Sequence, residues 1–213
     1  MSCIGTKKIL GVSEMKTVIE VGSNSGNDTK RFLDAGDCVY AFEPTPELHL
    51  FLKNRFKGYT NYYPVPMAVD INNGWANFNI AGNADWGCSS IFDFAPNIHD
   101  IWKGRSDFNV TDRCRVMTIR LDTFIDLYGL STIDYLWIDA QGNDFRVLQS
   151  LGDRINLVQA GQVEVAYEVN LYTGVDNSHA SVIQFLEENG FHHNTVPHHH
   201  KKEADVYFSR YSL

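Results

Sequence analysis

Two glycines and two carboxylates in the first fifty residues have the spacing of a nucleoside-binding unit. Gly22 and Gly26 follow the run Val-Ile-Glu-Val at 18–21, which is apolar except for Glu20, and Glu43 follows a second apolar run at 38–42. In a βαβ unit such glycines let the backbone approach a ligand, and an acidic residue about twenty positions after the first glycine accepts two ribose hydroxyls. These residues therefore predict a site for an adenosine-containing cofactor.

The details of the glycine pattern distinguish between cofactors. A dinucleotide fingerprint has the form Gly-x-Gly-x-x-Gly, which lets a pyrophosphate bind the amides at a helix N-terminus. This chain has Glu20-x-Gly22-x-x-x-Gly26 and lacks the middle glycine. Glu20 would repel a phosphate but suits a cationic ammonium or sulfonium. The pattern favours S-adenosylmethionine over NAD, and tight binding of NAD would support the alternative of a nicotinamide oxidoreductase.

Three further residues are candidates for catalysis. Asp139 ends an apolar run next to the predicted methyl donor, where it could act as a base or metal ligand, or simply satisfy loop amides. Glu164 lies in the next predicted strand, and if it faces Asp139 the pair could hold Mg²⁺ through oxygen ligands. His179 lies at a predicted helix start, either as a general base or as a solvent-exposed histidine.

A histidine-rich segment near the C-terminal end has two interpretations. His192 and His193 are followed by three consecutive histidines at 198–200, beside Lys201, Lys202 and Glu203. Such a cluster could chelate a transition metal. It could equally be a solvated loop, and the sequence leaves the role of residues 192–200 open.

Alternating strands and helices must position these residues. Apolar runs and turn signals predict strands near 18–21, 38–43, 62–69, 75–80, 116–120, 135–139, 162–167, 191–195 and 205–208. Helical spacing follows the first, second, fifth, sixth and seventh of these runs, and Pro64 and Pro66 predict an edge position for 62–69. The alternation predicts an α/β fold, a mostly parallel sheet with helices on both faces. Residues 81–115 lack clear periodicity and predict an irregular, lid-like or substrate-binding segment.

Length, charge and composition limit the class of protein. The 213 residues suit one domain over residues 1–213, and 44% of them are hydrophobic. A net charge of −8 argues against a broad electrostatic surface for nucleic acid. The four cysteines show no paired spacing for a zinc site, residues 1–14 lack the apolar run of a signal peptide, and no stretch reaches membrane-spanning length. We expect a cytoplasmic protein without membrane contact, and we leave a homo-oligomer possible.

With these residues identified, the chain resembles the FkbM family of S-adenosylmethionine-dependent methyltransferases. The resemblance runs through an ordered series of short motifs: Glu20-Val-Gly-Ser-Asn-Ser-Gly-Asn-Asp-Thr29, Phe42-Glu-Pro44, Val69-Asp70, Gly87-Cys-Ser-Ser90, Ile133-Asp-Tyr-Leu-Trp-Ile-Asp-Ala-Gln-Gly142, Gln162-Val-Glu164, Leu171-Tyr172 and Gly190-Phe191. It implies a seven-stranded Rossmann-like sheet of the class I methyltransferase fold, with the last strand antiparallel, and O-methylation of a sugar or small metabolite. The family often carries Lys-Ile-Asp-Val-Glu-Gly where this chain has Trp137-Ile-Asp-Ala-Gln-Gly142, so Trp137 replaces a lysine and Gln141 replaces a carboxylate.

Motifs and resemblance together give a set of predicted cofactor-binding residues: Glu20, Gly22, Ser23, Asn24, Gly26, Thr29, Glu43, Pro44, Met67, Ala68, Ser89 and Asp139. The two departures also favour an alternative function. A protein that binds the adenosyl cofactor without catalysis could regulate or scaffold a partner.

Overall fold

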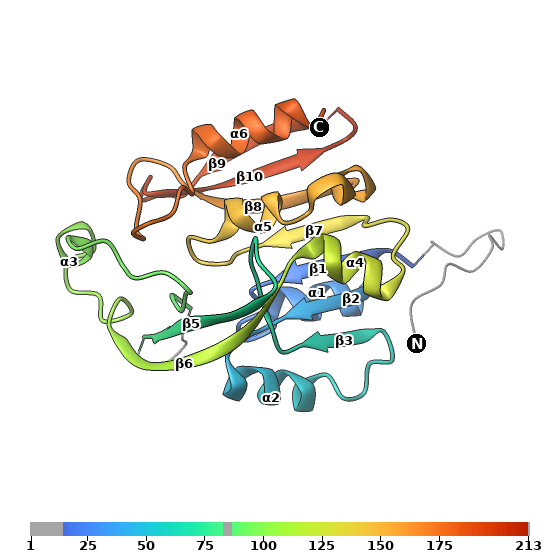
Figure 1. The fold of residues 1–213 in the computed structure, drawn as a ribbon, viewed down its shortest axis with the longest axis horizontal. Helices are drawn as coiled ribbons and strands as arrows, with labels where there is room; N and C mark the ends of the chain where they lie inside the picture. The colour runs from blue at the N-terminus through green and yellow to red at the C-terminus, as the bar shows by residue number, and fades with distance from the viewer. Residues whose placement is uncertain (1–14, 83–86, 213) are drawn as a thin grey trace.

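The computed structural model describes residues 15–82 and 87–212, and a seven-stranded sheet forms its centre (Figure 1). The strand order is β3-β2-β1-β7-β8-β10-β9, with bounds Thr17–Val21 for β1, Cys38–Phe42 for β2, Tyr62–Val65 for β3, Tyr135–Ile138 for β7, Ala160–Ala166 for β8, His192–Pro197 for β9 and Glu203–Ser209 for β10. Adjacent strands from β3 to β8 are parallel, and β10 is antiparallel to both of its neighbours. The expected mostly parallel sheet with an antiparallel last strand is confirmed.

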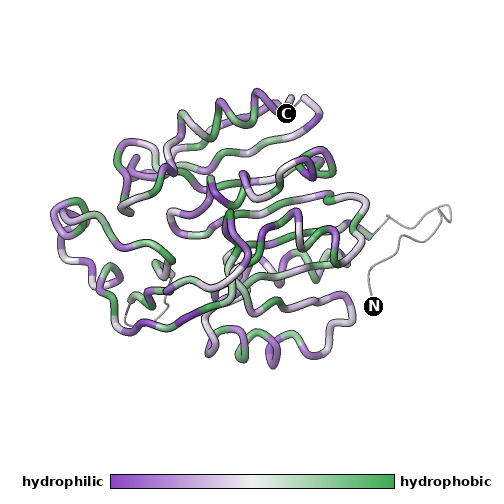
Figure 2. The backbone as a smooth tube through the Cα atoms, viewed as in Figure 1, coloured by the Kyte–Doolittle hydropathy of each residue, from purple (hydrophilic) through white to green (hydrophobic). Residues whose placement is uncertain are grey.

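Helices cover both faces of this sheet because both faces of the central strands are apolar. The helices are α1 Asn27–Asp34, α2 Pro46–Arg55, α4 Leu121–Tyr128, α5 Asp144–Gln149 and α6 His179–Glu188, with a short 3₁₀ helix at Gly152–Leu157. On one face, Val18 of β1 packs with residues of α1 and α2; on the other, Ile19 packs with residues of α4, α5 and α6. The apolar positions gather along the central strands, as Figure 2 shows. A strand buried on both faces is typical of parallel sheets.

A second, smaller sheet lies beside the first and corrects two expectations. It has the order β4-β6-β5, with bounds Ala68–Val69 for β4, Gly74–Ala81 for β5 and Val110–Ile119 for β6. The strand expected over 62–69 is therefore two strands, because the chain leaves the edge of the main sheet around Pro66 and enters the smaller sheet. The strand expected to begin near 116 begins at Val110, since residues 110–115 are held by backbone pairing with β5 and not by an apolar pattern.

The segment 81–115 is consequently irregular only in part. It includes the end of β5, a short helix α3 at Ile98–Ile101 and the first half of β6, while residues 83–86 lie outside the described part. Its central portion is attached to the main domain by a β-bridge between Phe94 and Tyr172 and by a hydrogen bond from Ser90 Oγ to the Gln141 carbonyl (2.7 Å). The segment thus lies next to the turn that follows β7. None of the helices in the described ranges could serve as a transmembrane span.

Candidate active site

A pocket that is open to solvent lies at the carboxyl ends of β1, β2 and β7. This is the edge at which open α/β sheets bind ligands. Its wall is formed by residues that follow these three strands and by residues of the smaller sheet and the segment after it: Val21, Gly22, Asn24, Phe42, Glu43, Pro44, Thr45, Leu48, Met67, Ala68, Val69, Phe78, Gly87, Ser89, Ile91, Asp139, Ala140, Gln141 and Asn143.

Gly22 allows β1 and β7 to approach each other at the floor of the pocket. Its φ is +90°, and a Cβ at this position would lie 1.9 Å from the Asp139 carbonyl oxygen. Only glycine fits such a contact, because the conformation is left-handed and the neighbour is backbone. The absence of a side chain at Gly22 therefore brings Asp139 to the pocket wall.

Glu43 is buried at the end of β2, and backbone amides hold both of its oxygens. Oε2 accepts from the amide of Asn24 (2.9 Å) and Oε1 from the amide of Thr45 (2.8 Å). Burial raises the pKa of this carboxyl, and the two amides partly oppose the shift. Each carboxylate oxygen has a second lone pair. Glu43 is thus fixed in one orientation with acceptor capacity left for ligand hydroxyls.

The predicted cofactor-binding residues divide into two groups by position. Those that line the pocket are Gly22, Asn24, Glu43, Pro44, Met67, Ala68, Ser89 and Asp139. Those that lie beneath it and shape the turn between β1 and α1 are Glu20, Ser23, Gly26 and Thr29.

Glu20 belongs to the second group because strand alternation places its side chain on the α1 face, like Val18. Its Oε2 accepts a hydrogen bond from the Thr29 hydroxyl at 2.6 Å. Burial raises the pKa of Glu20 to about 8. Ser23 Oγ donates to the Phe42 carbonyl (3.2 Å). The role of Glu20 as a ligand for the cofactor ammonium stays a prediction, and its observed contact is structural.

Gln141 connects the two predicted catalytic carboxylates. Its Nε2 donates to Asp139 Oδ1 (2.6 Å) and to Glu164 Oε2 (3.3 Å), and its Oε1 accepts from the Tyr172 hydroxyl (2.9 Å). The backbone of Gln141 is left-handed, with φ of +52°. Sequence reasoning treated this residue only as a departure from a family pattern, whereas the structure makes it the link of a network between β7, β8 and the segment that carries Tyr172.

Burial raises the pKa of both Asp139 and Glu164, and for Glu164 the negative charge of Asp139 raises it further. The amide hydrogens of Gln141 occupy the space between them, so this space does not offer the all-oxygen set that Mg²⁺ prefers. Asp139 lines the main pocket, whereas Glu164 lines a separate small cavity together with Gly142, Tyr172 and Glu203. The expected Mg²⁺ pair therefore does not fit this arrangement.

His179 lies apart from both cavities. Its Nε2 is 2.8 Å from the Thr195 hydroxyl, and its ring packs edge-on against Tyr167 with 5.2 Å between ring centroids. Burial lowers the pKa of His179, and the charge of His193 lowers it further. Its role as a general base stays a prediction that none of these contacts supports.

Two asparagines on the pocket wall carry unpaired acceptors. The Oδ1 atoms of Asn24 and Asn143 are buried without a hydrogen-bond partner in the described part of the chain, while Asn143 Nδ2 donates to the Val69 carbonyl (2.7 Å). Sequence reasoning missed Asn143, although its position two residues after Gln141 was a signal. Buried acceptors are normally satisfied by protein, ligand or water, so both atoms are available to N–H or O–H donors of a molecule in the pocket.

Comparison with known proteins agrees with this geometry. A family model described as the methyltransferase FkbM domain matches residues 20–192. The 2-O-methyltransferase NoeI of Sinorhizobium fredii is 25% identical over 163 residues, which are 74% of this chain and 65% of that protein, so the chain spans less than two thirds of this curated relative.

Solved structures share the fold. Fibrillarin of Aeropyrum pernix, in complex with natively bound S-adenosyl-L-methionine, matches with a TM-score of 0.51 and 13% identity over 91% of this chain and 66% of that one. The CurJ carbon methyltransferase matches with a TM-score of 0.51 and 10% identity over 93% of this chain and 49% of that one. At such low identities the likeness concerns the fold alone.

Proposed function

The chain belongs to the FkbM methyltransferase family, and we propose that it transfers the methyl group of S-adenosylmethionine to a hydroxyl of a sugar or another small metabolite. Its sheet has the class I S-adenosylmethionine-dependent methyltransferase fold, which places the cofactor at the carboxyl ends of the strands. O-methylation is supported by the name of the relative NoeI.

The acceptor-rich pocket wall is the observation that carries the cofactor assignment. S-adenosylmethionine presents ribose hydroxyls, an adenine amine and an ammonium group, all of which donate hydrogen bonds. Glu43, Asn24 and Asn143 offer acceptors on the wall, and the first is held by two amides. NAD would present its adenosine ribose to Glu43 in the same way, but its pyrophosphate binds next to the middle glycine of the dinucleotide fingerprint, which this chain lacks. The acceptors on the wall therefore fit an adenosyl group, and the missing middle glycine favours S-adenosylmethionine over NAD.

Methyl transfer is an in-line displacement at the sulfonium methyl, so the chain must position an acceptor hydroxyl and take up its proton. Asp139 is suited to accept this proton because it lines the pocket and Gln141 fixes its orientation. Its raised pKa makes it a stronger base than an exposed aspartate. Glu164 would act through Gln141 by holding the other amide hydrogen, without touching the acceptor.

Calorimetric titration with S-adenosylmethionine, S-adenosylhomocysteine and NAD tests the cofactor. We expect the adenosyl ligands to bind and Glu43→Ala to weaken their binding by about 1.5–3 kcal/mol, the value of hydrogen bonds to a charged group. Glu47→Ala is the matched control, since Glu47 is exposed on the neighbouring helix. Thermal unfolding of both variants separates lost binding from lost folding. Failure of the wild type to bind either adenosyl ligand would refute the proposal.

The non-catalytic binder is distinguished by turnover. Gln141, in place of the frequent family carboxylate, favours that alternative, although Asp139 keeps its carboxylate on the pocket wall. Incubation with methyl-labelled S-adenosylmethionine and a panel of sugars and phenolic or aliphatic alcohols should give a labelled product that Asp139→Asn suppresses. Cofactor binding without labelling of any acceptor would support the regulatory role.

A further inference from the structure

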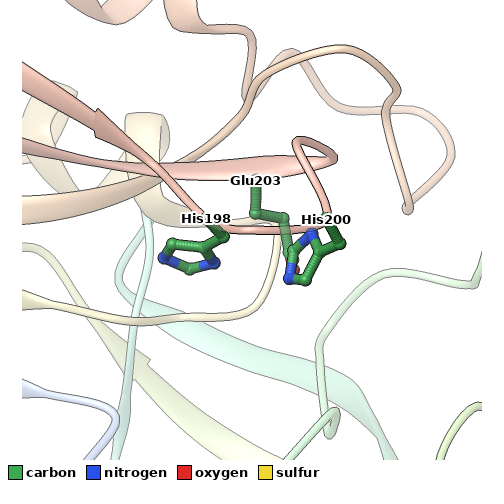
Figure 3. Close-up of side chains that lie close together, drawn as sticks. All are labelled: His198, His200 and Glu203. Carbon is green, nitrogen blue, oxygen red and sulfur yellow. The ribbon is translucent and has the colours of Figure 1, made fainter.

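The turn between β9 and β10 gathers imidazoles and a carboxylate on one side. The His198 amide donates to the Glu203 carbonyl (3.0 Å), and the Lys201 amide donates to the His198 carbonyl (2.8 Å). These bonds close the turn, and Figure 3 shows His198, His200 and Glu203 projecting to the same side of it. Their side chains are only 26%, 16% and 18% exposed. The turn is therefore closed by backbone hydrogen bonds, and these three side chains are partly buried, unlike those of the solvated loop that the sequence also allowed.

Potential ligand atoms within this group are close enough to share one ion. One ring nitrogen from each histidine and one Glu203 oxygen lie within 4.8 Å of one another, and His200 Nε2 is 3.9 Å from Glu203 Oε2. Tetrahedral zinc with bonds of about 2.0–2.2 Å separates its ligands by roughly 3.3–3.6 Å. Small side-chain rotations therefore suffice to close the site.

Further carboxylates extend the cluster beyond the turn. Glu164 and Asp205 form a second group with His198 whose ligand atoms also lie within 4.8 Å, and Asp205 Oδ2 is 3.3 Å from His198 Nε2. In the described part of the chain, the ion pairs of Glu203 and Asp205 are with histidines, and neither carboxylate is paired with lysine or arginine. Three carboxylates lie close to His198, and among the described residues no lysine or arginine is ion-paired with Glu203 or Asp205, an arrangement that favours a bound cation.

The mixture of ligands indicates which cation. Imidazole with carboxylate suits zinc and its neighbours in the transition series, whereas Mg²⁺ and Ca²⁺ prefer oxygen ligands alone. Two histidines and one glutamate also form the ligand set of zinc sites that keep an open position. Lys202 Nζ and the Arg105 guanidinium lie over the Trp102 ring, at 4.1 and 4.8 Å from its centroid. Their charges act on His200, and that of Arg105 also acts on Glu203, but in the described part of the chain neither cation forms an ion pair with Glu203.

We propose that His198, His200 and Glu203 bind a divalent transition-metal ion of the zinc type, with Asp205 orienting His198. Glu203 also lines a small cavity together with Glu164, so this ligand lies between the turn and that cavity. When His200 binds the ion through Nε2, its ring proton lies on Nδ1, which can then no longer accept the hydrogen bond from the Lys202 amide (3.2 Å). Metal binding thus breaks one weak hydrogen bond and forms three ligand bonds.

Metal content of the full chain tests the site without any assay of activity. Protein stripped with a chelator and dialysed against Zn²⁺ should retain about one ion per chain, and Co²⁺ should give visible absorption typical of a protein-bound ion. His198→Ala and His200→Ala should each weaken Zn²⁺ binding by more than about tenfold. His199→Ala is the matched control, because His199 is exposed between the two ligands, and it should leave the affinity unchanged.

A measurement on the wild type guards against variants that fail to fold. Zn²⁺ should protect His198 and His200 from acylation by diethylpyrocarbonate while His199 remains reactive, as read by mass spectrometry of peptides. The proposal would be overturned if the wild type retained no ion, or if His199→Ala weakened Zn²⁺ binding as much as the ligand variants do. Acylation of all three histidines in the presence of Zn²⁺ would also overturn it.

Discussion

Replacing Gln141 by glutamate tests the link between the two carboxylates. The change keeps the size of the side chain but removes the amide hydrogens that Asp139 and Glu164 accept at 2.6 and 3.3 Å. Hydrogen bonds to charged groups contribute about 1.5–3 kcal/mol each. Because the second bond is long, we expect the free energy of unfolding to fall by about 3 kcal/mol near pH 8.

The loss should be smaller in acid. The carboxyl introduced at position 141 lies next to two others, so its pKa is higher in the folded chain than in the unfolded chain. While it is protonated, it can donate one hydrogen bond. A folded-state pKa above the unfolded value means that the folded chain binds more protons, so stability falls as pH rises through that interval. The same sign applies to the raised pKa values of Asp139 and Glu164 in the wild type. The variant should therefore show a steeper decline from about pH 5 to about pH 8.

Urea unfolding of both proteins across this pH range measures the effect. Gln184→Glu is the matched control, since Gln184 Nε2 also donates to a carboxylate, that of Glu188 (2.8 Å), but on an exposed helix surface. There the like-charge pair should cost only about 0.2–0.5 kcal/mol. A Gln141→Glu penalty that is independent of pH, or no larger than that of the control, would refute the argument for a linked pair of carboxylates.

Two further substitutions test the turn below the pocket. Gly22→Ala should lower the free energy of unfolding by more than about 3 kcal/mol, because the new Cβ would overlap the Asp139 carbonyl oxygen. Gly36 has a similar φ of +87° but open space around it, so Gly36→Ala should lower this free energy by only about 1–2 kcal/mol. Urea titration measures both. The stability of the wild type should decline between about pH 4.5 and the Glu20 pKa of about 8, and Glu20→Gln should remove this decline. Because the Thr29 hydroxyl can still donate to the amide oxygen, the variant should be more stable than the wild type by up to about 4 kcal/mol near pH 8. Equal costs for the two glycines, or parallel pH curves for Glu20→Gln and wild type, would contradict these reasons.

The sequence predicted those parts of the site whose positions depend only on neighbouring residues in the chain. Gly22 and Glu43 lie at strand ends where a turn follows directly, so their positions at the pocket follow from the order of strand, turn and helix. Glu20 also lies in that motif, yet it does not reach the pocket wall. Strand alternation from Val18 contained this information, because side chains two residues apart in a strand share a face.

Contacts between distant segments could not be read from the sequence. Gln141 meets Glu164 and Tyr172 across 23 and 31 residues, and this depends on a left-handed backbone at a residue other than glycine. The first half of β6 was missed for a related reason. Residues 110–115 are mostly polar and exposed, and their strand exists because β5 supplies the hydrogen bonds.

Gln141 also makes the cofactor pocket and the proposed metal site interdependent. Its single side-chain amide donates to Asp139 on the pocket wall and to Glu164 beside His198. An ion that draws Glu164 towards His198 would weaken the longer bond and leave the amide to Asp139 alone, which stabilises the ionised form of that carboxylate. Coupling between two binding sites is reciprocal. The factor by which Zn²⁺ changes the affinity for S-adenosylmethionine must therefore equal the factor by which the cofactor changes the affinity for Zn²⁺. Because the amide is the connection, Gln141→Leu should reduce this factor towards one even if each ligand still binds.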